Sequence, residues 1–187
     1  MMPTALIRGE RVSLRPVRLE DVDHLLRWAT HPEVARLAQG GYPVTREGTL
    51  KWLQEALHDR YRKLFLILGP DGTPIGDIDV HHIAWRSGEG ELRIRIGEPP
   101  LWGRGYGTDA IRTLLRHLFQ HGHLRRIYLR VLRDNHRAVR CYRKCGFRVE
   151  GRRVERRQDG QLQEVLLMSV RLEELDYVQP PSWPQAG

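Results

Sequence analysis

Residues 90–120 place the strongest constraint on the fold, because a strand, a glycine-rich loop and a helix follow one another there without a break. Apolar and charged side chains alternate in "GELRIRIG" (90–97), which is the pattern of a half-buried strand. The apolar residues from Thr108 to about Gln120 recur at helical spacing and predict an amphipathic helix. Between them, "WGRGYG" (102–107) carries three glycines, which let a backbone bend sharply or approach another molecule closely.

The rest of the chain mixes hairpin patterns with helices that cross between strands. Strands are expected at 11–17, 64–68, 75–80, 90–97 and 126–131 and in a closing hairpin around "QDGQ", and helices at 19–30, 31–38, 46–59, 108–120 and 135–145. This order predicts an α/β fold with a mixed sheet of about seven strands and helices on both faces. Because no linker divides the chain, residues 1–172 are expected to form a single domain and residues 173–187 a loosely ordered tail.

Positive charge is unevenly distributed along the chain. The formal net charge is +8, and residues 112–157 hold 15 of the 31 Lys and Arg residues but only three acids. Such a field attracts phosphates or acidic partners, and charge alone does not separate nucleic acid, a phosphorylated small molecule and a merely solubilising surface. Apolar runs are too short to cross a membrane, a signal-peptide core is lacking, and two cysteines imply no disulfide framework. The cytoplasm is therefore the expected compartment, with no membrane partner.

The glycine loop lies where a phosphate would bind. Backbone N–H groups at a helix start lack partners and carry partial positive charge, and Arg104 adds a full charge. The dinucleotide fingerprint is excluded because neither Thr108 nor Ala110 is glycine, and the P-loop is excluded because no Gly-Lys-[Ser/Thr] follows. The loop alone leaves open both a phosphate ligand and a plain turn.

A second motif begins 28 residues after Gly107. The stretch "NHRAVRCYRKCGF" (135–147) matches every fixed position of N-x-x-A-x-x-x-Y-x-K-x-G-F, and "WGRGYG" is similar to Q/R-x-x-G-x-G/A, with Trp102 in place of Gln or Arg. In this order the motifs resemble those of the GNAT superfamily of acyl-CoA-dependent N-acetyltransferases. The resemblance covers residues 8–172, looks like the RimJ/RimL-like branch of ribosomal-protein acetyltransferases, and implies a GNAT-type central sheet that splays open.

The resemblance implies acetyl-CoA as co-substrate and also implies which residues hold it. The loop backbone would bind the pyrophosphate, and the strand at 90–97 would pair with the pantetheine arm through its own backbone. The implied cofactor-binding residues are Ile94, Ile96, Trp102, Gly103, Arg104, Gly105, Tyr106, Gly107, Thr108, Asn135, Ala138 and Tyr142. Asn135 is also suited to cap the helix that follows it, which is the safer of its two assignments.

No metal is expected. The thiols of Cys141 and Cys145, with His117, His121 and His123, match no standard zinc-ligand spacing. No base is evidently paired with either cysteine, so both thiols are expected to be buried or inert rather than to carry an acyl group.

The implied reaction is direct acyl transfer from a thioester to a neutral amine. Tyr142 is the candidate acid for the departing thiolate, because a phenol with a pKa of about 10 stays protonated at neutral pH. Glu91 is the first candidate for the base, directly or through water. The alternatives are Glu89, His81, His82 and Asp79, or a chain of waters with no dedicated base. A strand amide near Ile94 would stabilise the oxyanion.

The acceptor amine is the open question at this level. A protein N-terminal amine, for example on a ribosomal protein, comes first, and a small amine, an amino-acid-like antibiotic or an aminoglycoside follows; residues 20–60 and 83–90 would shape its cleft. The positive charge argues mildly against a polycationic aminoglycoside.

The oligomeric state is expected to be a monomer or a homodimer. The competing class is a non-catalytic basic module that binds RNA or the ribosome, or an acyl-CoA sensor. The three glycines argue against it, and direct nucleic-acid binding is not the expected role.

Overall fold

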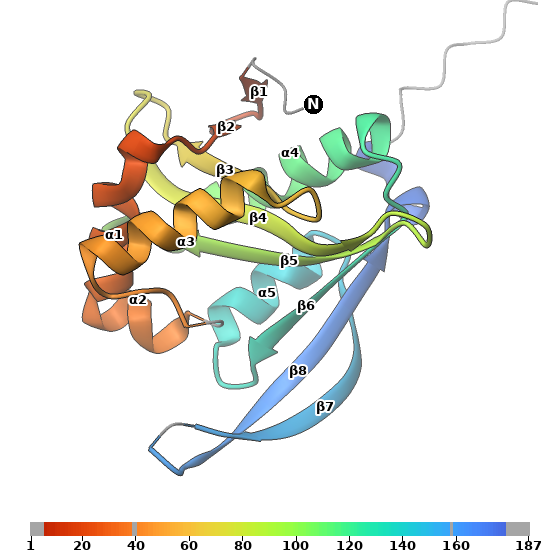
Figure 1. The fold of residues 1–187 in the computed structure, drawn as a ribbon. Coiled ribbons are helices and arrows are strands. Elements are labelled where there is room, and N and C mark those ends of the chain that lie inside the picture. Colours follow the sequence, from red (N-terminus) through yellow and green to blue (C-terminus); the bar gives the residue numbers. More distant parts are fainter. Residues whose placement is uncertain (1–5, 39–40, 158, 179–187) are drawn as a thin grey trace, which may run out of the picture.

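The computed structural model describes residues 6–38, 41–157 and 159–178, which form one sheet of eight strands with helices around it (Figure 1). The spatial order of the strands is β1-β2-β3-β4-β5-β6-β8-β7. The strands are β1 (Ile7–Arg8), β2 (Ser13–Pro16), β3 (Lys63–Leu68), β4 (Pro74–Ala84), β5 (Glu89–Ile96), β6 (Arg126–Leu132), β7 (Arg148–Arg156) and β8 (Leu162–Arg171). The α-helices are α1 (Val22–Thr30), α2 (Pro32–Leu37), α3 (Arg46–His58), α4 (Tyr106–His121) and α5 (His136–Lys144).

Helices cover both faces of the sheet, as predicted. Buried residues of α1, α2 and α3 pack with Leu64 and Leu66 of β3, whereas those of α4 and α5 share a core with Phe65 and Ile67 of the same strand. Because β3 is buried on both faces, its apolar run shows no polar alternation. The sheet exceeds the expected seven strands by β1, a two-residue edge strand that is too short to give a periodic signal.

The sheet splays open between β5 and β6, the one parallel pair among the described strands. Their pairing is limited to residues 89–91 of β5 and 126–128 of β6, after which the two strands separate (Figure 1). The remaining five residues of β5 therefore have no strand partner on that side. This confirms the expected splay, and it leaves an open strand edge in the middle of the molecule.

The segment after β8 is packed rather than loose as far as Val178. It forms two short 3-10 turns, Leu172–Glu174 and Asp176–Val178, and Leu175 and Val178 are buried. The Tyr177 hydroxyl donates to the carbonyl oxygen of Cys145 at 2.7 Å. The expectation of a loose tail from residue 173 is thus corrected for 173–178, because these apolar side chains complete the core beside α4. Residues 179–187 lie outside the described residues.

In the part of the chain that the structure describes, none of the helices combines the length and the apolar character that a membrane crossing requires.

Candidate functional site

A cavity of about 340 Å³ lies where β5 and β6 separate, between the glycine loop, α4 and α5. The site residues predicted from the sequence that line it are Glu91, Ile94, Ile96, Trp102, Gly103, Gly105, Tyr106, Gly107, Thr108, Asn135, Ala138 and Tyr142. Arg104 is the exception, since it is absent from the lining and its carbonyl oxygen accepts a hydrogen bond from the Arg11 guanidinium. Of the two segments expected to shape the acceptor cleft, 20–60 contributes to the lining and 83–90 does not.

The glycine loop leads into α4, whose first turn borders the cavity and has no side-chain cap. Gly103 and Gly105 have φ values of 73° and 85°, in the left-handed region that favours glycine. Gly105 is the N-cap of α4, so the helix begins at Tyr106, two residues before the expected Thr108. No side chain of the described residues caps it. The carboxylate of Asp109, in its first turn, instead accepts from the backbone N–H groups of the N-terminal segment.

The open edge of β5 and the start of α5 form the walls beside this helix. The Trp102 indole N–H donates to the carbonyl oxygen of Ile96 at 2.8 Å, and the Arg137 guanidinium stacks 3.7 Å from the Trp102 ring centroid. Trp102 therefore fastens the loop to the end of β5. The Asn135 side chain accepts from the Ala138 N–H at 3.3 Å, which confirms its capping assignment. Its contact with a cofactor stays a prediction.

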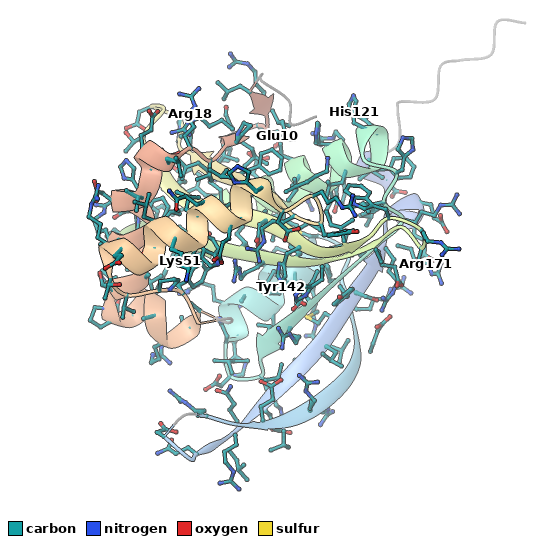
Figure 2. The ribbon with its side chains drawn as sticks, viewed as in Figure 1. Glu10, Arg18, Lys51, His121, Tyr142 and Arg171 are labelled. Atoms are coloured by element: carbon teal, nitrogen blue, oxygen red, sulfur yellow. The ribbon has the colours of Figure 1, made fainter. Side chains whose placement is uncertain are left out.

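Tyr142 lies on α5 at the centre of the molecule (Figure 2). The Tyr142 ring packs edge-on to Phe147. The residue is 8% exposed and lines the cavity. Burial, reinforced by the nearby Cys141 thiol, raises the pKa of Tyr142 above its usual value of 10. The phenol thus stays protonated across the neutral and mildly alkaline range, as a proton donor must.

Three of the other base candidates gather around Glu91, although only Glu91 and His81 line the cavity. One oxygen of the Glu91 carboxylate accepts from Arg130 Nε at 2.8 Å, and the other lies 3.2 Å from His82 Nδ1 and 3.6 Å from His81 Nε2. His81 Nδ1 in turn lies 3.4 Å from Asp79. Glu89 does not join this group, since it pairs with Arg126 at 3.0 Å and is absent from the cavity lining.

Two opposing effects set the pKa of the carboxyl groups here. Burial alone would raise the pKa of Glu91, but the hydrogen bond and charge of Arg130 outweigh it and hold the pKa below its usual value. Burial likewise opposes ionisation of Asp79, and the contacts with His81, Arg93 and Arg62 hold its pKa low. Both groups are therefore carboxylates at neutral pH.

A β-bulge brings both histidines to Glu91. Consecutive strand residues normally point to opposite faces of a sheet. The register of β4 against β5 shifts between His81 and Ala84, and His82 takes the left-handed φ of 50°, so the two imidazole rings lie 4.6 Å apart. The ligand atoms of His81, His82 and Glu91 lie within 4.8 Å of one another, as in a metal site. Because the Arg130 guanidinium already pairs with the Glu91 carboxylate, we assign no metal to this cluster.

The sequence analysis did not predict a ladder of charged pairs between β4 and β5 that begins at His81 and Glu91. In the register of β4 against β5, His81 faces Glu91, Asp79 faces Arg93 and Asp77 faces Arg95. The alternation in "GDIDVHH" is the signal that would have found it, because it matches "GELRIRIG" on the neighbouring strand. Tyr42 covers the ladder, with its ring centroid 3.8 Å from the Arg95 guanidinium carbon.

The two cysteines have different surroundings. Cys145 is fully buried, as expected, whereas Cys141 is half-buried and lines the cavity. Its sulfur lies 3.3 Å from the Thr108 hydroxyl in the first turn of α4. A hydrogen bond from Cys145, and then that from Thr108, lowers the pKa of Cys141 to about 7 against the effect of burial. Cys141 is therefore the more exposed and the more readily ionised of the two thiols.

Known proteins share both the sequence pattern and the fold. Residues 11–148 match the family described as "Acetyltransferase (GNAT) domain". The uncharacterized N-acetyltransferase p20 of Bacillus licheniformis is 25% identical over 167 residues, which are 86% of this chain and 93% of that protein. Spermidine N(1)-acetyltransferase of Escherichia coli K12 is 28% identical over 151 residues, which are 80% of this chain and 77% of that protein.

The same fold occurs in a solved structure. The crystal structure of spermidine N-acetyltransferase from Vibrio cholerae in complex with CoA and spermine has a TM-score of 0.80 to this chain at 24% identity. The match covers 90% of this chain and 98% of that one.

Proposed function

The chain belongs to the GNAT acetyltransferase domain family, and we propose that it transfers the acetyl group of acetyl-CoA directly to an amine within the cavity. One observation carries the proposal: the uncapped start of α4, the open edge of β5 and the Tyr142 side chain all border the same cavity. A helix start without a side-chain cap suits a pyrophosphate, and an open strand edge suits the amide-containing pantetheine arm. Between them they can position a thioester beside Tyr142.

The cofactor end of the cavity is suited to a polyphosphate. Arg137, Arg140 and Lys144 line it from α5, and the left-handed glycines of the loop let the backbone approach an anion closely. We assign the pyrophosphate to the N–H groups of residues 106–108 and the remaining phosphate to one or two of these cations. Acetyl-CoA as the donor also supports the cytoplasm as the compartment.

Different residues carry out the proton transfer to the thiolate and the proton transfer from the amine. Tyr142, protonated and buried, gives its proton to the coenzyme A thiolate as the carbon–sulfur bond breaks, and it is reprotonated through water by the second proton that the nitrogen loses as the amide forms. Glu91 carries a lowered pKa, so it is a weak base, but Arg130 bonds only one of its oxygens and the other can accept a hydrogen bond from the incoming amine. We therefore propose that Glu91 holds the acceptor amine, and that its proton leaves through water past His81, which lines the cavity beside Glu91. The amine then attacks with a free lone pair.

Two acceptor classes compete within this reaction. The names of the E. coli and V. cholerae relatives point to a polyamine. The sequence resemblance to the RimJ/RimL-like branch points to a protein N-terminal amine. Both are primary amines, which the cavity and the proposed proton steps accept, and the charges around Glu91 bear on the choice.

Thermal melting with and without acetyl-CoA tests the proposal. We expect a rise in the melting temperature at micromolar acetyl-CoA and release of free coenzyme A when an amine is added. The non-catalytic alternative, a basic RNA- or ribosome-binding module, predicts no shift. An acyl-CoA sensor predicts a shift without release for any amine in a broad panel. Either of these results would reject direct acetyl transfer.

A further inference from the structure

Glu91 is the one carboxylate among the described residues that line the cavity, and the lining also holds six cationic side chains. The residues outside the described ranges add no Asp or Glu side chain, because the sequence has none there. Three of the cations lie on α5 at the cofactor end. Of the other three, Arg130 of β6 pairs with Glu91, and Arg93 and Arg95 lie two and four residues farther along β5. The acceptor end is thus rich in positive charge.

The acidic groups near Glu91 are already paired. Asp77 accepts from Arg95 Nε at 2.7 Å, with both side chains 3% exposed. Asp79 lies within 3.3 Å of Arg93 and 3.2 Å of Arg62. Glu91 itself pairs with Arg130 and, in the proposed mechanism, holds the reacting amine. A polyamine brings further ammonium groups, and this end of the cavity offers them no free carboxylate.

The arginines, by contrast, keep unused donors. Nη1 and Nη2 of Arg95 are buried and have no hydrogen-bond partner, and neither has Nε of Arg93. A buried donor without an acceptor is costly, and a guanidinium with two free N–H groups fits a carboxylate in bidentate geometry. Arg95 lines the cavity beneath Tyr42, whose ring centroid lies 3.8 Å from the guanidinium carbon, and Trp28 lies beside it at 5.8 Å, so a carboxylate reaches the free N–H groups when Tyr42 moves aside.

We propose that the acceptor is an amine that also carries a carboxylate, which Arg93 and Arg95 recognise while Glu91 holds the amine. This inference rests on the proposed acetyl transfer and names its substrate class. Two residues along a strand span about 7 Å and four span about 13 Å, so the amine and the carboxylate are separated by several bonds. An ω-amino acid has this shape, as does a peptide N-terminus followed by an acidic residue.

Matched acceptor pairs test the charge directly. With the full chain and acetyl-CoA, release of coenzyme A is measured for 6-aminohexanoate against 6-aminohexanamide, and for the tripeptide amides Ala-Asp-Ala against Ala-Asn-Ala. We expect kcat/KM to be at least tenfold higher for the acidic member of one pair or both, and spermidine to be poorer than either acid. The pair with the larger ratio identifies a free amino acid or a peptide as the source. Equal rates within both pairs, or spermidine as the best acceptor, would overturn the inference.

Two variants locate the carboxylate. Arg93→Gln leaves Asp79 paired with Arg62 and His81, and Arg95→Lys keeps a positive charge beside Asp77. For each we expect the acid-over-amide ratio to fall at least fivefold through a higher KM for the acid, with kcat little changed. Arg153→Gln removes the same charge from exposed β7 and should keep the ratio of the unchanged chain. A ratio unaffected by both cavity variants would reject these arginines as the recognition groups. If no amine releases coenzyme A and acetyl-CoA causes no melting shift, the proposed transfer fails instead.

Discussion

The two ends of the cavity are constructed differently. The cofactor end is mostly main chain, with left-handed glycines, the uncapped first turn of α4 and an unpaired edge of β5, and three cationic side chains of α5 beside them. The acceptor end consists of side chains, in which buried charges on β4 and β5 pair across the strands beneath Tyr42. Main-chain sites require particular residues at fixed local spacing, whereas cross-strand sites depend on register between distant segments. One end can therefore be recognised as a motif, and the other can change its substrate without disturbing that motif.

The acceptor end should be the more fragile of the two, and Asp79→Asn tests this with the largest expected effect. Asp79 is buried between Arg62, Arg93 and His81, and loss of its charge leaves the two guanidinium groups without their carboxylate partner. Breaking a buried pair in this way costs about 3–5 kcal/mol of unfolding free energy. Denaturant unfolding at pH 7 measures it. The exposed Asp159→Asn is the control, and its unfolding curve should remain close to that of the unchanged chain.

The same pair of proteins gives a pH test. The pKa of Asp79 in the folded chain is held below its usual value of 3.8. Ionised Asp79 therefore stabilises the fold fully above that value, and this stabilisation disappears as the pH falls through the lower pKa of the folded state. The stability gap between Asp79→Asn and the unchanged chain should narrow below pH 4. A gap that stays constant down to pH 2 would contradict the charge pairing.

Tyr142→Phe comes next in size and separates binding from chemistry. Removing the phenol takes away the acid for the thiolate but leaves the ring packed against Phe147. General acid catalysis contributes about 100-fold or more, so kcat should fall by at least this factor. The melting shift caused by acetyl-CoA should remain, because the glycine loop and α4 are intact. A variant with nearly full turnover would show that water or another group protonates the thiolate.

Substitution at the cofactor end should affect binding more than stability. Gly105→Ala places a side chain at a φ of 85°, and Gly160→Ala does the same at 83° in the hairpin turn before β8. Each should cost about 1–2 kcal/mol of unfolding free energy. Only Gly105 belongs to the proposed phosphate cradle, so only its substitution should also reduce the melting shift with acetyl-CoA. Equal shifts in both variants would separate Gly105 from the binding site.

The difference between the two ends also explains what the sequence could reveal. The strand, loop and helix over 90–120 were predicted in the right order, because periodicity and glycine placement are local signals. The pairing of Asp77 with Arg95 was not predicted, since it needs the register of two strands. The bulge at His82 was missed because a left-handed histidine has no sequence signature of the kind that glycine provides. The packing of Leu175 and Val178 was missed because the apolar residues of this segment form too short a run to give a periodic signal.

Alkylation of the cysteines gives the smallest expected effect and tests whether the cofactor end is occupied as proposed. A pKa of about 7 means that Cys141 is mostly thiolate at pH 8, and its half-buried sulfur faces the cavity beside Thr108. Cys145 is buried, and its pKa is raised, first by its hydrogen bond to Cys141 and then by burial, so it serves as the internal control.

Mass spectrometry after brief iodoacetamide treatment should find Cys141 modified and Cys145 unmodified. Saturating acetyl-CoA should slow the modification about fivefold, because a pantetheine arm along β5 covers this wall. Equal rates with and without acetyl-CoA would mean that the cofactor does not pass between β5 and α5, and the assignment of the open strand edge would then be wrong.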